Sequence, residues 1–163
     1  MTQDPEPISP AIHRRLAVSN FNRSWELMLA PGRTPAQDDE LIHTVHASAY
    51  HWRMFGGTPA NLARGENQCA RVYAALNRSE AALYHATRCL ELTEAGGEGF
   101  EDWDFASALE VLARAYLVAG NRKQALAAAA RCREALAAVA DQDDREVIAG
   151  QLAELGLGEG SRA

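Results

Sequence analysis

The sequence has 163 residues, of which 47% are hydrophobic and only 7% aromatic, and it carries a net charge of −6 with a pI near 5.3. An acidic chain lacks the basic field that displaces counterions from phosphates, so no nucleic-acid partner is expected. The length suits one domain or one short helical-repeat array, and no apolar run approaches the roughly 20 residues that a membrane-spanning helix needs.

Much of the apolar content is alanine, which favours closely packed helices, whereas the β-branched residues that sheets prefer are scarce. The three cysteines, Cys69, Cys89 and Cys132, form no CxxC pair, and each lies within a helical apolar pattern. We therefore expect them to be reduced and to pack as small hydrophobic side chains. These features predict an all-α, cytoplasmic protein without a cofactor. Lys123 is the only lysine and every other strong base is arginine, which together with the alanine and glycine usage indicates a bacterial source.

The chain is predicted to begin with a disordered lead over residues 1–9, which is acidic and rich in proline, and to end in a flexible tail over residues 156–163. Residues 10–155 between them are predicted to form a single helical domain. Thr34-Pro35 and Thr58-Pro59 carry the same start signal, a threonine N-cap followed by proline at the first helical position. The predicted helices span about residues 10–30, 35–55, 59–76, 78–95, 101–119, 122–140 and 143–155.

An internal repeat relates residues 69–92 to residues 112–135 at a constant offset of 43. Such self-similarity is the sequence signature of a repeat architecture. The residues that recur unchanged 43 positions later are Ala70, Arg71, Tyr73, Ala82, Leu83, Ala86, Arg88, Cys89 and Glu91.

This pattern resembles the tetratricopeptide repeat (TPR), which has a small residue three before an aromatic in its first helix and another small residue about nine further on. Ala70, Tyr73 and Ala82 occupy these positions, and so do their counterparts 43 residues later. The spacing is longer than is usual for the family, and the closing proline is missing. The resemblance covers about residues 35–140 and extends to small bacterial members. It implies three antiparallel helix pairs followed by a C-terminal capping helix.

In such arrays the first helix of each pair lines a concave surface. The resemblance assigns six residues to that surface: Arg64, Asn67, Arg71, Ser107, Glu110 and Arg114. Neighbouring guanidinium groups can bind carboxylates bidentately, which suits an acidic peptide, a chain terminus or a small anion. Alternatively, Arg71 and Arg114 pair with local acids such as Glu66 and Glu110, and Glu110–Arg114 has the favourable i,i+4 order.

A second candidate lies in the predicted helix over residues 35–55. At 100° per residue, Asp39, His43, His46 and Tyr50 share one face, and Glu40 and His51 flank it. Glu40, His43 and His46 form an ExxHxxH sequence, and ExxH is the ligand spacing of carboxylate-bridged metal sites in helical bundles. No second ExxH and no HExxH is present. Structural hydrogen bonding, ligand recognition and metal binding therefore remain open for this face.

Two functional hypotheses follow. The first is a non-catalytic interaction module that binds a protein or peptide partner, or a small anionic ligand, through Arg64, Asn67, Arg71, Glu110 and Arg114, with His43, His46 and Tyr50 as further binding candidates. An array this short can also self-associate into a homodimer. The alternative is a helical-bundle metal protein or enzyme centred on Glu40, His43 and His46.

Overall fold

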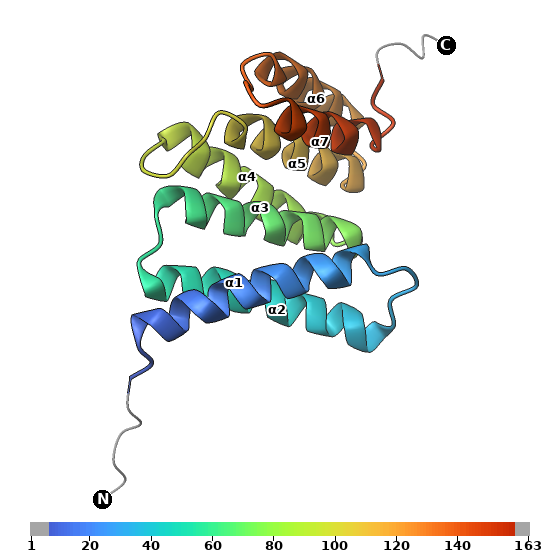
Figure 1. Cartoon of the computed structure of the whole chain (residues 1–163). Helices are drawn as coiled ribbons and strands as arrows, with labels where there is room; N and C mark the ends of the chain where they lie inside the picture. Colours follow the sequence, from blue (N-terminus) through green and yellow to red (C-terminus); the bar gives the residue numbers. More distant parts are fainter. Residues whose placement is uncertain (1–6, 159–163) are drawn as a thin grey trace, which may run out of the picture. The chain divides into compact units, whose positions relative to one another are not determined.

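The computed structural model describes residues 7–158, so residues 1–6 of the predicted lead and 159–163 of the predicted tail lie outside the described residues. Across that range the chain forms helices and no strands, which confirms the all-α class (Figure 1). The helices are α1 (Pro10–Leu29), α2 (Pro35–Phe55), α3 (Pro59–Ala75), α4 (Ser79–Ala95), α5 (Asp104–Val118), α6 (Arg122–Leu136) and α7 (Gln142–Ala153). Among the described residues, no helix combines the length and apolar character that crossing a membrane would require.

Packing divides the chain between Gly57 and Thr58 into two compact units. The N-terminal unit contains α1 and α2, and the C-terminal unit contains α3 to α7. Both threonine start signals form as predicted. Thr34 caps α2 in a reciprocal capping box with Gln37, and Thr58 caps α3 in the same way with Asn61.

In the N-terminal unit, α1 and α2 form an antiparallel pair (Figure 1). Its contact face carries small polar residues as well as apolar ones. The Ser48 hydroxyl donates to the Ala17 carbonyl at 2.8 Å, and Ser24 and Thr44 bond to each other at 3.1 Å. These two bonds satisfy polar groups that the pairing buries, as a buried hydroxyl requires. Arg33 fastens the connecting turn by donating to Asp38 at 2.7 Å.

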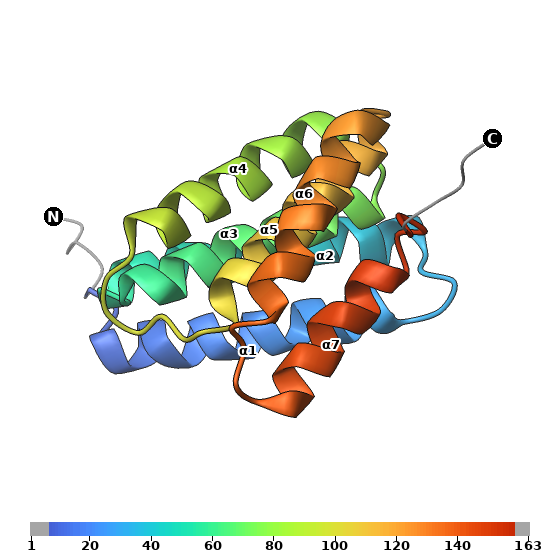
Figure 2. The same ribbon diagram turned by 90° about the horizontal axis from the view of Figure 1, so that it is seen from above.

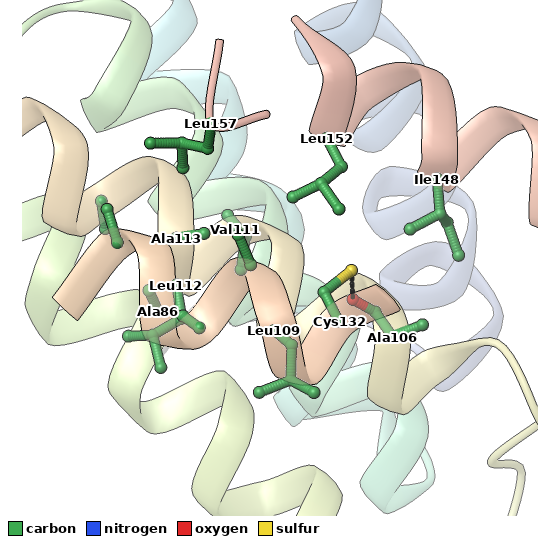
Figure 3. Packing of buried hydrophobic residues seen from close by; sticks show 14 of the residues in the cluster. Ala86, Ala106, Leu109, Val111, Leu112, Ala113, Cys132, Ile148, Leu152 and Leu157 are labelled. Atoms are coloured by element: carbon green, nitrogen blue, oxygen red, sulfur yellow. Dashed lines mark hydrogen bonds between the residues drawn. The ribbon is translucent and has the colours of Figure 1, made fainter. Parts of the chain in front are cut away.

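In the C-terminal unit, α3 pairs with α4 and α5 pairs with α6, while α7 packs on α5 and α6 (Figure 2). Helix α5 is the centre of this unit, because nine of its fifteen residues are buried. The small residues of the internal repeat pack between the helices. Ala70, Ala82 and Ala86 are fully buried, and so are their counterparts 43 residues later. Figure 3 shows part of this core, in which the Cys132 thiol donates to the Ala106 carbonyl at 3.2 Å.

Two helix boundaries differ from the prediction by three or more residues because carboxylates near the α4–α5 connection accept backbone N–H groups there. Helix α5 begins at Asp104 rather than near Glu101, since the Asp104 carboxylate accepts the Glu101 backbone N–H at 2.8 Å and closes a turn before the helix. Helix α6 ends at Leu136 rather than near Ala140, whose N–H instead donates to Asp102 at 2.8 Å.

Candidate functional site

The residues assigned to a concave surface lie on the facing helices α3 and α5 of the C-terminal unit. We call them the arginine face, which comprises Arg64, Asn67 and Arg71 of α3 with Ser107, Glu110 and Arg114 of α5. Spacings of three and four residues place each trio on one side of its helix. Asn67 ties the two helices together, because its amide donates to both the carbonyl and the hydroxyl of Ser107 at 3.2 Å.

A buried carboxylate organises the centre of the arginine face. Glu110 is 0% exposed and accepts from Arg71 on α3 and from Arg114 one turn further along α5, the latter at 2.8 and 3.1 Å. Arg71 is 7% exposed and also donates to Asn67 at 3.0 Å. Burial lowers the pKa of Arg71, while the charge of Glu110 opposes that change. The predicted Glu110–Arg114 pair is therefore present.

The partner of Arg71 is less local than the sequence suggested. Arg71 bonds to Glu110 across the interface between α3 and α5, while the carboxylate of Glu66 lies 2.6 Å from His85 Nδ1. Arg71 and Glu110 are 39 positions apart, so no local spacing rule reveals their contact.

Arg64 occupies one end of the arginine face, beside the α4–α5 connection. It makes a bidentate pair with Asp104 at 2.9 and 2.7 Å, and its guanidinium lies 4.5 Å from the centre of the Trp103 ring. The hydrogen bond with Asp104 raises the pKa of Arg64. Rigid planar geometry and a stacked aromatic hold the guanidinium in a fixed orientation.

Helix α7 covers part of the arginine face, which the sequence did not predict. The side-chain oxygen of Gln151 accepts from Arg71 at 2.9 Å, and its backbone carbonyl accepts from Arg114 at 3.1 Å. Glu154 lies 3.5 Å from Arg114 but is largely exposed, so this ion pair contributes little. Arg64 and Arg114 keep 28% and 23% of their side chains exposed. Arg71 and Glu110 are instead enclosed between helices.

We call Asp39, His43, His46 and Tyr50 of α2 the histidine face, and it lies in the N-terminal unit. His43 is exposed, Tyr50 is 56% exposed, and His46 follows His43 by one turn. Glu40 pairs with Arg23 of α1 at 2.8 Å, and this bond lowers the pKa of Glu40. Among the described residues of this unit, no three His, Cys, Asp or Glu side chains bring ligand atoms within 4.8 Å of one another.

A close histidine contact in that unit joins α1 to α2. The Nδ1 atoms of His13 and His51 are 2.7 Å apart, and the ring of Tyr50 lies 5.3 Å from that of His51. One Nδ1 must donate while the other accepts, so at least one ring is neutral. Burial, and then the neighbouring His13, lowers the pKa of His51. The sequence placed His51 beside the histidine face but did not identify His13.

A separate hollow of about 610 Å³ lies at the turn between α3 and α4. Its lining runs from Asn77 to Ala81 and includes Tyr84, which is 66% exposed, and His85. Every residue predicted as a binding site lies outside this hollow.

Comparison with known proteins supports the fold. No family model and no curated protein sequence matches the chain. The crystal structure of a TPR-like protein from Chlorobium tepidum is similar, with a TM-score of 0.65 over 91% of this chain and 99% of that one, at 17% sequence identity. At this identity the match concerns the fold alone. The chain therefore has the TPR-like helical-repeat fold that its internal repeat predicts.

Proposed function

We propose that this protein is an interaction module and that its arginine face holds an acidic segment of a partner protein. The observation that carries the proposal is a row of three arginines, Arg64, Arg71 and Arg114, which buried carboxylates hold in fixed orientations. Guanidinium groups fixed in this way lose little conformational entropy when they bind a further carboxylate. First helices of TPR-like pairs line a concave surface, which is where a bound segment would lie.

The charge balance of the face supports an acidic partner. Three arginines face two buried acids, Asp104 and Glu110, so the arginine face carries a local positive charge. The whole chain, by contrast, has a net charge of −6. The exposed acids nearby are screened by water and offset this local positive charge only weakly. The exposed parts of Arg64 and Arg114 offer N–H groups to a ligand, and the ring of Trp103 beside Arg64 offers an apolar contact.

A display library of random peptides tests this proposal with the full chain as bait. Enriched peptides are expected to be acidic, and the affinity of the best one is measured by fluorescence anisotropy. Arg64→Gln and Arg114→Gln should each weaken its binding at least about tenfold, because a hydrogen bond to a charged group contributes about 1.5–3 kcal/mol.

Matched controls come from the second helices of the pairs. Arg88 on α4 and Arg131 on α6 are half-exposed arginines, each paired with an exposed glutamate. Arg88→Gln and Arg131→Gln make the same change in charge and should alter the affinity less than twofold. Equal losses in both sets, with every variant folded by circular dichroism, would show that the peptide does not bind the arginine face.

A further inference from the structure

Helix α7 contacts the arginine face much as a bound peptide would. Gln151 supplies two oxygens, one to Arg71 and one to Arg114, and these bonds join residues that are 80 and 37 positions apart. The next turn brings the carboxylate of Glu154 to 3.5 Å from Arg114. All three contacts place an oxygen acceptor against a guanidinium, which is the chemistry proposed for the partner.

The sequence of α7 is that of an acidic helix with a narrow apolar edge. Ile148 and Leu152, one turn apart, are its two buried residues and point into the core of the C-terminal unit (Figure 3). Between residues 141 and 154 there are five acidic residues and one basic residue, Arg145. The helix therefore offers an apolar edge and a negative charge together, which complements the arginine face.

Helix α7 itself buries few residues. Two of its twelve residues are buried, compared with nine of fifteen in α5. Gly150 lies in its last turns with open space around it, and glycine is a poor helix former. At its other end, burial and then the charges of Asp141, Glu101 and Asp102 raise the pKa of Asp144, so like charges meet where α7 begins.

We infer that α7 is a built-in, displaceable occupant of the arginine face, and that the partner is an acidic helix with an apolar edge which takes its place. This inference rests on the proposed function and specifies the partner. The partner must present two apolar residues one turn apart and an oxygen-bearing side chain directly before the second, as Ile148, Leu152 and Gln151 do. The apparent affinity of this partner is its intrinsic affinity multiplied by the fraction of molecules in which α7 has left the arginine face.

A fluorescent peptide with the sequence of residues 141–157 tests the inference on the intact chain. Gly150→Ala in the protein strengthens α7 without a steric clash, because the added Cβ has no neighbour within 4 Å. It should weaken binding of the peptide about fivefold, the equivalent of the helix-propensity difference between glycine and alanine. Leu152→Ala in the protein loosens α7 and should tighten binding at least tenfold.

Two controls make the outcome decisive. A peptide with Gln151→Lys and Glu154→Lys should not bind any of the proteins, because it places cations against the arginines. Hydrogen exchange should show α7 amides exchanging faster in the Leu152→Ala protein while α3 and α5 stay protected. Equal peptide affinity for all three proteins would overturn the inference. Absence of binding to the Leu152→Ala protein, with α7 released and α5 protected, would do so as well.

Failure of this inference is distinguishable from failure of the proposed function. Library-selected peptides that depend on Arg114 but bind the Gly150→Ala protein as well as the native one would refute displacement of α7 and leave the arginine face as the binding site. Selected peptides that ignore Arg64 and Arg114 would refute the proposed function itself.

Discussion

Replacing Glu110 by glutamine tests whether the buried carboxylate organises the arginine face. Glu110 is 0% exposed, and the side chain of Arg71 is 8% exposed, so neither group can be solvated when its partner is lost. The side chain of Arg114 is 23% exposed and can turn partly towards water. Removing one partner of a buried ion pair costs about 3–5 kcal/mol. Because glutamine keeps one acceptor oxygen, we expect the free energy of unfolding to fall by about 3 kcal/mol, the lower end of this range.

The free energy of unfolding is measured by urea titration followed by circular dichroism, with hydrogen exchange of the α5 amides as a local probe. A loss of about 3 kcal/mol corresponds to a midpoint lower by roughly 1 M urea or more. Glu91→Gln is the matched control, since Glu91 pairs with Arg88 at 3.0 Å but is 57% exposed. That change should cost at most about 1 kcal/mol. If both substitutions cost the same small amount, the network does not hold α3 against α5.

Two further predictions concern groups whose pKa is shifted in the folded protein. The pKa of His51 is lowered in the folded protein, so the unfolded chain binds a proton at this residue more readily than the folded protein does. The contribution of neutral His51 to the free energy of unfolding is therefore complete above about pH 6.5. It is lost as the pH falls through the lowered pKa. The urea midpoint of the native protein should therefore fall more between pH 7.5 and pH 5 than that of His51→Gln, and equal falls would exclude this role. Burial raises the pKa of Cys89 and Cys132 to about 12 and also raises that of Cys69. All three thiols should react with Ellman's reagent slowly at pH 8 in the folded protein and fast in urea, and fast reaction without urea would contradict their burial.

Local sequence signals predicted much of the fold because they act over a few residues. Thr34-Pro35 and Thr58-Pro59 start α2 and α3 because the threonine hydroxyl caps the first turn whatever packs on it later. The offset of 43 predicted the buried alanines, since a repeat must place small residues wherever helices approach closely. The start of α5 was displaced by a turn that depends on Asp104, whose carboxylate also binds Arg64 from another helix.

The candidate site was predictable only in part. The i,i+4 rule identified Glu110 with Arg114, and the TPR-like pattern placed Arg64, Asn67 and Arg71 on one side of α3. No local rule could supply Gln151, because its contact with Arg71 spans 80 residues and depends on how α7 packs. The pairing of His13 with His51 was missed for the same reason, since it spans 38 residues between two helices.

The central claim is that the arginine face holds an acidic helix in competition with α7. Its most direct test follows the arginine Nε–Hε signals and the backbone amides of the full chain by NMR while the best library-selected peptide is added. The account predicts shifts for Arg64 and Arg114, together with faster hydrogen exchange along α7. Shifts confined to α4 and α6, with α7 unchanged, would contradict it.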